Sequence, residues 1–271
     1  MRSWLADPDA SGAASGADLI ATAVPALGEA GFGAALLGAL GAALPVGSLS
    51  VYRTGARPAI FLTASTDVHD TTRDCWRAYL SGPIRHDRTL RSALPQAPSR
   101  PLQRPHLCHI TAGEVPSEHR AKVYEAHGVA ERISVVEEDA EGDVFAVNFY
   151  RHARQRPLND GQIADFSQMG GLLMALTRKH VALTLASASG TRMQDAQIDR
   201  LRELQPALTV REVEVCSRLL QGMSQDGIAA DLNIGVPTVK TYRNRAFARL
   251  GIHFRSELFA LASGAMPMRR N

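Results

Sequence analysis

Helix signals follow one another between Leu208 and Ala262, and their spacing leaves little choice of fold for this stretch. A first helix begins at Thr209, because Thr209 and Glu212 have the spacing of a capping box, in which each side chain bonds a free N–H of the helix start. Apolar residues then recur every three or four positions until Gly222 ends the helix. These apolar residues are Val213, Cys216, Leu219 and Leu220.

Two further helices follow closely. Ser224 is a typical cap for a short second helix, whose inward residues are Ile228, Ala229 and Leu232. Residues 233–235 make a turn, and Pro237 then lies in the first turn of a third helix, where a missing N–H costs nothing. This helix runs to about Gly251. Two helices joined by a tight turn, with a third packed behind them, predict a helix-turn-helix.

The third helix separates its residues by chemistry when they are placed 100° apart. One side is mostly apolar and is expected to pack: Val239, Tyr242, Ala246 and Leu250. The opposite side carries Lys240, Thr241 and Asn244 at its centre. Its margins carry Arg243, Arg245 and Arg249, and no acidic residue occurs from Val236 to Leu250.

Such a face suits a DNA major groove. Lys can donate to guanine N7 and O6, and Asn can bond adenine in a bidentate way. Flanking arginines would hold phosphates, which give position and salt-dependent affinity without reading the sequence. From charge alone, a solvated basic face on an ordinary helical hairpin is an equal alternative.

The segment resembles the DNA-binding domain of LuxR-type (GerE-type) transcriptional regulators. Matching positions are Leu208, Thr209, Arg211, Glu212, Gly222, Ser224, Ile228, Ala229, Leu232, Ile234, Thr238, Val239, Lys240, Leu250, Gly251 and Arg255. The resemblance implies base-facing positions at Lys240, Thr241 and Asn244. It implies phosphate or supporting contacts at Ser224, Thr238, Arg243, Arg245 and Arg249. It also implies a dimerisation helix at residues 255–262, double-stranded DNA as partner, a homodimer, and RNA polymerase as a partner of an activator.

Three positions depart from the family pattern. Gly227 stands where Glu is usual, which removes a capping box from the second helix. Gly235 replaces a Ser cap, at a cost of a few tenths of a kcal/mol. Tyr242 replaces a frequent His on the inward side. None of them removes the basic outward face, so we expect DNA binding to persist.

The length of 271 residues leaves room for a sensor of about 170 residues before this domain. The net charge of +3 is compatible with nucleic acid without demanding it. Three scattered cysteines, Cys75, Cys108 and Cys216, suit a reducing cytoplasm. The apolar run 32–44 is too short to cross a bilayer, so we expect a cytoplasmic protein without a membrane segment.

The upstream pattern predicts five parts along the chain. Residues 1–18 are expected to be disordered, 19–185 to form the sensor, 186–205 to be a linker, 206–265 to form the helix-turn-helix domain and 266–271 to be a tail. Within the sensor we expect two packed helices over 19–46 and a hairpin of strands 49–53 and 59–63. A helix over 71–80, an irregular span over 82–105, a strand over 107–110 and a helix over 117–127 follow. A second hairpin, 132–138 with 144–151, and a helix from Asn159 to about Leu185 complete the unit.

These elements predict an α+β sensor, an antiparallel sheet with flanking helices, joined to an all-α DNA-binding domain. Such an outline is similar to GAF or PAS domains and to the autoinducer-binding domains of LuxR-type proteins. Trp76, Tyr79 and Asp87 resemble weakly the set with which those domains hold an acyl-homoserine lactone. Their spacings are each one residue short, and Trp76 and Tyr79 are also explained as core residues of a helix.

Other chemistries have weaker support. His106, Cys108 and His109 are near each other, but no second cluster at ligand spacing accompanies them, so we predict no metal and no cofactor. A phosphorylated receiver domain needs a Lys at the end of a strand, whereas the lysines of the N-terminal region, Lys122 and Lys179, lie inside predicted helices. No phosphate loop or nucleophile elbow indicates an enzyme. We therefore expect a transcriptional regulator whose sensor responds to a small molecule or partner. One alternative is a regulator whose N-terminal domain is a protein-interaction module without a ligand. Another is an enzyme joined to a DNA-binding domain.

Overall fold

The computed structural model describes residues 1–6, 13–41, 44–67, 71–91, 94, 105–139 and 142–266. The chain divides into two compact units, residues 1–184 and 185–271. Each unit has its own apolar core. No helix in the described ranges is both long and apolar enough to span a membrane.

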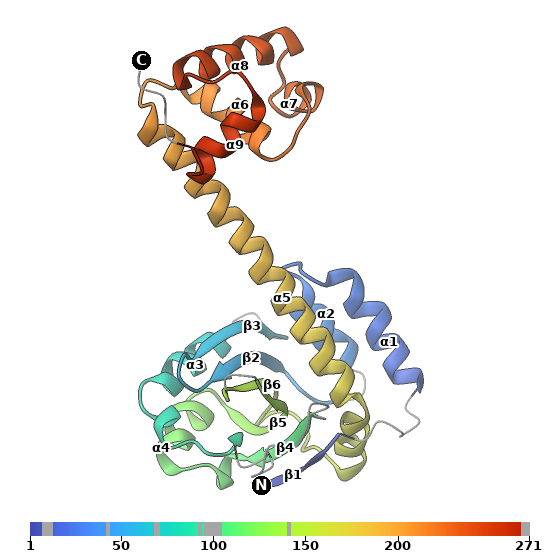
Figure 1. The fold of residues 1–271 in the computed structure, drawn as a ribbon. Coiled ribbons are helices and arrows are strands. Elements are labelled where there is room, and N and C mark those ends of the chain that lie inside the picture. Colours follow the sequence, from blue (N-terminus) through green and yellow to red (C-terminus); the bar gives the residue numbers. More distant parts are fainter. Residues whose placement is uncertain are drawn as a thin grey trace. The chain divides into compact units, whose positions relative to one another are not determined.

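The N-terminal unit is built on a sheet of six antiparallel strands in the order β1-β4-β5-β6-β2-β3 (Figure 1). The strands are β1 (Arg2–Leu5), β2 (Ser48–Thr54), β3 (Ala59–Ser65), β4 (His106–Thr111), β5 (Val129–Glu138) and β6 (Val144–His152). Both predicted hairpins, β2 with β3 and β5 with β6, are confirmed. The sheet with its flanking helices confirms the predicted α+β class.

Both faces of this sheet are covered, so its strands alternate between two cores. Val135 and Val147 lie in one core and their neighbours Val136 and Ala146 in the other, as the period of two in a strand requires. The first core is closed by helices α1 (Ala13–Ala23), α2 (Phe32–Gly41) and α5 (Asp160–Leu204). The second is closed by α3 (Thr72–Leu80), α4 (Ser117–His119) and the π-helical η5 (Arg120–Glu125). The short 3₁₀ turns η1 (Val24–Ala26), η2 (Pro83–Arg85) and η4 (Ala112–Glu114) complete the described elements of the N-terminal unit.

The start of the chain corrects the prediction that residues 1–18 are disordered. Residues 2–5 form β1, which pairs with β4, and residues 13–18 belong to α1. The indole Nε1 of Trp4 donates to Ser167 Oγ at 2.7 Å, and its ring packs on the first core. Residues 2–5 are thus held in place by strand pairing with β4, which the composition of this segment does not reveal. Residues 7–12 lie outside the described ranges.

The long helix α5 begins as predicted and ends later. Asn159 and Gln162 cap it reciprocally, with N···O distances of 3.1 and 2.8 Å. The residues predicted as a linker, 186–205, are helical as far as Leu204. Alanines favour helix here and no proline interrupts it. Leu201, near its end, is buried in the core of the C-terminal unit.

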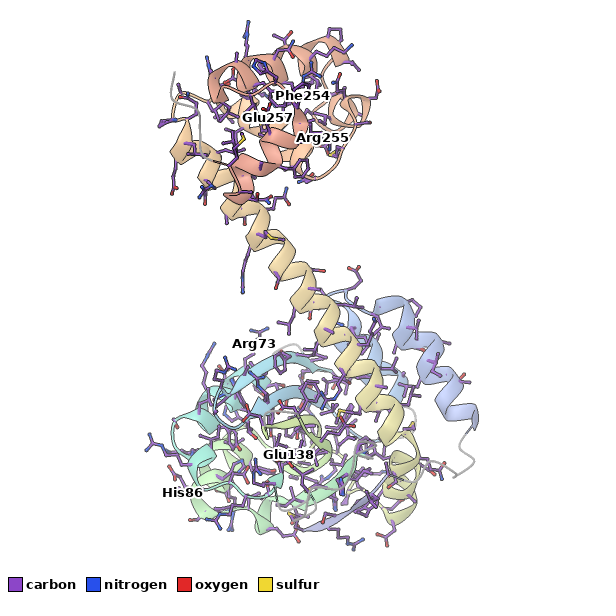
Figure 2. The ribbon with its side chains drawn as sticks, in the orientation of Figure 1. Arg73, His86, Glu138, Phe254, Arg255 and Glu257 are labelled. Atoms are coloured by element: carbon purple, nitrogen blue, oxygen red, sulfur yellow. The ribbon has the colours of Figure 1, made fainter. Side chains whose placement is uncertain are left out.

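The C-terminal unit contains the four predicted helices: α6 (Val210–Leu220), α7 (Gln225–Asp231), α8 (Val236–Leu250) and α9 (Arg255–Ser263). The capping box of α6 is present, and Ser224 Oγ accepts from Gly227 N at 3.1 Å at the start of α7. Gly222 has a φ of 88°, which only glycine adopts at little cost. At α9, Glu257 Oε2 accepts from Phe254 N at 2.9 Å (Figure 2).

Candidate functional site

Helix α8 presents the two faces that its periodicity predicts. Val239, Ala246 and Leu250 are fully buried, and Phe247, which periodicity did not assign to the core, is also buried. Tyr242 is half-buried against the same core. Lys240, Thr241 and Asn244 are exposed on the opposite side.

Two of these outward residues are oriented by short contacts. Thr241 Oγ1 donates to Pro237 O at 3.0 Å, which occupies the hydroxyl proton within the helix. Arg243 donates through Nε and Nη2 to Asn244 Oδ1 at 3.1 and 2.7 Å. Because guanidinium only donates, the amide NH₂ of Asn244 remains available as a donor.

The remaining predicted DNA contacts fall into two groups. Thr238, Lys240 and Arg245 are exposed, and within the described ranges no side chain bonds Lys240 or Arg245. Arg249 is exposed too, but its Nη1 donates to Ala207 O at 2.8 Å and pairs with Glu212 within its own domain. Ser224 is occupied as a helix cap.

In the N-terminal unit, the structure brings Trp76, Tyr79 and Asp87 together. Trp76 and Tyr79 lie on α3 with ring centroids 5.8 Å apart, and both are buried. The Tyr79 hydroxyl donates to Asp87 Oδ2 at 3.0 Å, and Thr89 N donates to Asp87 Oδ1 at 2.8 Å. Asp87 therefore already accepts through both oxygens.

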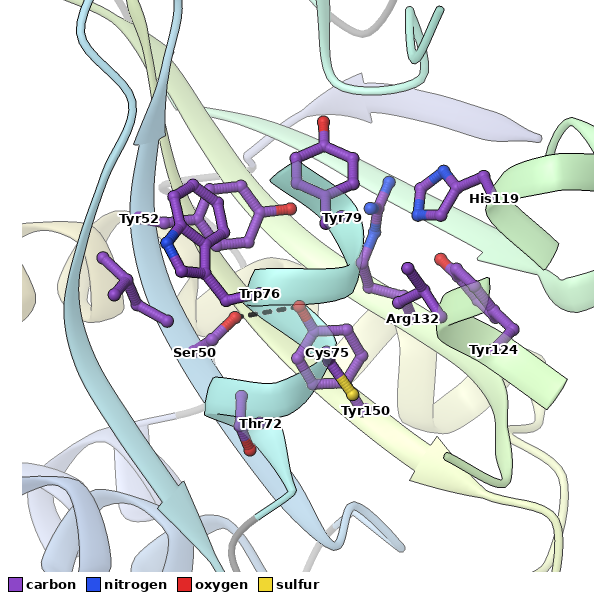
Figure 3. A pocket seen from close by; sticks show the side chains of 12 residues that line it. Ser50, Tyr52, Thr72, Cys75, Trp76, Tyr79, His119, Tyr124, Arg132 and Tyr150 are labelled. Atoms are coloured by element: carbon purple, nitrogen blue, oxygen red, sulfur yellow. Dashed lines mark hydrogen bonds between the residues drawn. The ribbon is translucent and has the colours of Figure 1, made fainter. Parts of the chain in front are cut away.

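Trp76 and Tyr79 line a cavity of about 20 Å³ between the sheet and the α3, α4 and η5 layer (Figure 3), which holds about one water molecule. Side chains that line it include Tyr52, Trp76, Tyr79, His119, Tyr124 and Arg132. Tyr52, Trp76 and Tyr79 form an aromatic wall with centroid separations of 4.9 to 6.1 Å. At another edge, Ser50 Oγ and Tyr150 OH are 2.8 Å apart.

Several polar residues of the cavity were missed at the level of sequence, and Arg132, His119 and Tyr124 are the most buried of the charged and titratable ones. Arg132 is 2% exposed and its Nη2 donates to Thr89 Oγ1 at 2.8 Å. His119 is also 2% exposed, with Nδ1 3.5 Å from Asp87 Oδ2, beyond a hydrogen bond. Tyr124 is 1% exposed. The one available signal was Arg132, a charge in the alternating apolar pattern of a strand.

The electrostatics of the cavity follow from burial and from two opposite charges. Burial tends to raise the pKa of Asp87, but the charges of Arg132 and His119 and the hydrogen bonds from Thr89 together outweigh it, so the pKa lies below its ordinary value. Burial lowers the pKa of His119 to about 4, although Asp87 opposes the shift. Burial raises the pKa of Tyr124 to about 12. At neutral pH the cavity is therefore lined by an Arg cation and a neutral His, and the Asp87 carboxylate lies against Tyr79 and His119.

The cluster His106, Cys108 and His109 does not converge on one point. Cys108 is buried in the second core, with Sγ 3.8 Å from Thr89 O. His109 lies on the other side of β4, where Nε2 is 3.0 Å from Glu131 Oε2. Glu131 in turn pairs with Arg151 at 2.7 Å. The surroundings of His109 are those of a buried ion-pair network.

Comparisons with known proteins identify the C-terminal segment. Residues 206–262 match the family of bacterial regulatory proteins, luxR family. The chain is 27% identical over 163 residues to a protein of Aeromonas salmonicida described as an HTH-type transcriptional regulator in the exeN 3′ region; the match covers 57% of this chain and 83% of that protein.

Three solved structures are similar to parts of the chain. The VqsR ligand-binding domain of Pseudomonas aeruginosa has a TM-score of 0.45 and 19% identity, covering 62% of this chain and 95% of that one. CepR2 of Burkholderia cenocepacia, described as N-acylhomoserine lactone dependent, has a TM-score of 0.43 and 16% identity, covering 65% and 99%. SdiA of Escherichia coli has a TM-score of 0.33 and 16% identity, covering 83% and 87%. With its family match and its four observed helices, the segment 206–262 is a helix-turn-helix domain of the luxR family of bacterial regulatory proteins.

Proposed function

We propose that the protein regulates transcription by placing α8 in the DNA major groove. The observation that carries this proposal is the exposed face of Lys240, Thr241 and Asn244 on a luxR-family domain. Lys240 and Asn244 would read base edges as donors, and the Thr241 methyl group would contact a thymine methyl. Thr238 and Arg245 would hold phosphates. Arg243 would orient Asn244, and Ser224 and Arg249 would support the fold.

The active form would be a homodimer in the cytoplasm. Helix α9 supports this part of the proposal, because Phe259 is 38% exposed on a helix whose other side is buried. Two copies of α8 would then enter successive major grooves about one helical turn apart on a near-palindromic site. RNA polymerase would be a partner if the protein activates.

We further propose that the unit 1–184 is a sensor. Its signal, a small molecule or a partner, would bind one conformational state of the protein more tightly than the other and so change the placement of the two α8 helices. The polar groups around the cavity support a small-molecule signal. The small size of that cavity supports a second candidate, in which the unit acts through protein contacts alone. In either case the role is regulation and not catalysis.

Selection of bound sequences from a random DNA pool by the full-length protein, with and without an extract of its native cells, tests the proposal. We expect a two-fold symmetric motif, and dependence on the extract would favour a small-molecule signal. The matched control carries Lys240→Ala and Asn244→Ala, two changes on the exposed face that leave the core intact. A failure to recover any motif, with or without extract, would refute base reading by α8.

A further inference from the structure

Among the residues that the structure describes, three buried polar atoms that find no hydrogen-bond partner border the same cavity of the N-terminal unit. They are Arg132 Nε on β5, Tyr124 OH on η5 and His119 Nδ1 at the end of α4, and all three side chains border the cavity (Figure 3). A buried polar group left unpaired destabilises a fold, so native proteins rarely keep several in one place. Their convergence marks a place where a polar group from outside the chain is expected.

The three atoms share one chemical property. Arg Nε only donates, while a Tyr hydroxyl and a neutral His Nδ1 can each donate as well. A group that satisfies all three is therefore an acceptor, and a single oxygen can accept more than one bond. Asp87, the strong acceptor nearby, already accepts from Tyr79 and Thr89. An N–H of a ligand would thus have to compete with bonds inside the protein.

The apolar part of the cavity is aromatic. Tyr52, Trp76 and Tyr79 present their rings as one wall, which suits stacking or edge contact with a planar ring. A cavity of about 20 Å³ accommodates the polar end of such a molecule. The rings of the wall must part to admit its body, which makes Trp76 a direct reporter of binding.

We propose that Arg132, Tyr124 and His119 recognise the hydrogen-bond-accepting end, a carboxylate or carbonyl oxygen, of a small aromatic molecule. Recognition requires no amide N–H on that molecule. This inference rests on the proposed sensor function of the unit and gives the chemical class of its signal.

Three aromatic probes of similar size separate the contributions of the ring, of an acceptor oxygen and of its charge to binding. They are benzoate, acetophenone and ethylbenzene. The first ends in a charged acceptor, the second in a neutral acceptor and the third in none. The chain has two tryptophans, so full-length protein carrying Trp4→Phe reports on Trp76 by fluorescence. We expect saturable binding of an acceptor probe and about 10-fold weaker binding of ethylbenzene. Preference for benzoate identifies a carboxylate, and preference for acetophenone a carbonyl.

The decisive variant is Tyr124→Phe, which removes a hydroxyl that bonds no group in the described part of the chain. We expect the bound acceptor probe to weaken about 3- to 10-fold while the melting temperature of the unliganded protein stays the same or rises. A merely structural tyrosine would instead lower that temperature. Tyr242→Phe in α8 is the matched control and should leave probe binding unchanged. Arg132→Met should weaken benzoate most, and Tyr124→Phe remains the test if the Arg132 variant does not fold.

Equal binding of ethylbenzene, indifference to Tyr124→Phe, or binding of none of the three probes would each overturn the inference and leave the cavity to a water molecule. The DNA selection on the same protein distinguishes this failure from a failure of the proposed function. A recovered motif without probe binding would refute the assigned ligand class alone.

Discussion

Arg249, near the end of α8, pairs with Glu212 in the first turn of α6. The Glu212 side chain is 2% exposed, and its Oε2 also accepts from Thr209 N at 2.7 Å. One carboxylate thus closes a helix cap and fastens the end of the DNA-facing helix. This pairing gives Arg249 a role inside the domain that differs from the other arginines of α8.

Substitution Arg249→Met is therefore expected to lower stability more than DNA affinity. It removes the partner of a buried carboxylate and a bond to Ala207 O, at a cost of about 1–3 kcal/mol in the free energy of unfolding. Urea unfolding of the C-terminal unit measures this loss. The salt dependence of DNA binding should keep its slope. A reduced slope with unchanged stability would place Arg249 on a phosphate instead.

Arg245→Ala is the counterpart on the same helix. Arg245 is exposed, and we expect it to hold a phosphate, because a cation there releases one counterion from DNA. Binding should weaken on all sequences, and the slope of log K against log salt should fall in magnitude by about one. Affinities measured over a series of salt concentrations provide the slope. If it matches the wild-type slope, Arg245 does not touch the backbone.

The C-terminal domain could be predicted because its determinants are local. Thr209 with Glu212, and the residue Ser224 before α7, act within one turn of helix, and both caps are confirmed. The same is true of the hairpins, whose strands alternate around short turns. Where the sequence interpretation failed, the stabilising contacts are distant. Strand β1 depends on β4, and Trp4 on Ser167, which is 163 residues away.

The candidate sites divide in the same way. The exposed face of α8 follows from helix periodicity alone. The cavity set Arg132, His119 and Tyr124 does not, because β5 and the consecutive helices α4 and η5 pack around a common cavity only in the folded unit. Trp76, Tyr79 and Asp87 were named together through a weak family resemblance, and the structure brings Asp87 to Tyr79; their role in holding a ligand stays a prediction.

Asn244→Ala is expected to affect specificity. The amide NH₂ of Asn244 faces outward because Arg243 occupies its oxygen. Loss of this contact should cost about 1–3 kcal/mol on the selected site and blur the preference at one base pair. Binding to a panel of single-base variants measures both effects. Equal weakening on every variant and on unrelated DNA would contradict a base-reading role.

The acid sensitivity of the N-terminal unit is expected to depend on His119. Burial lowers the pKa of His119 to about 4, from about 6.5 in an unfolded chain. Between these values the unfolded chain binds more protons than the native one, so stability falls as pH decreases. The full contribution is present above about pH 6.5 and about 3 kcal/mol of it is lost by pH 4. Asp87, whose pKa is lowered, adds its own loss only below that window.

His119→Phe isolates this contribution, because the variant keeps a buried ring and removes the titrating group. Urea unfolding at pH values from 7 to 4 should show a shallower decline for the variant than for the wild type. Buried His152 and His180 titrate in both proteins, so they cancel in the difference. Parallel declines for the two proteins would mean that His119 is charged in the native state as readily as in the unfolded chain, and that its burial beside Asp87 and Arg132 does not keep it neutral.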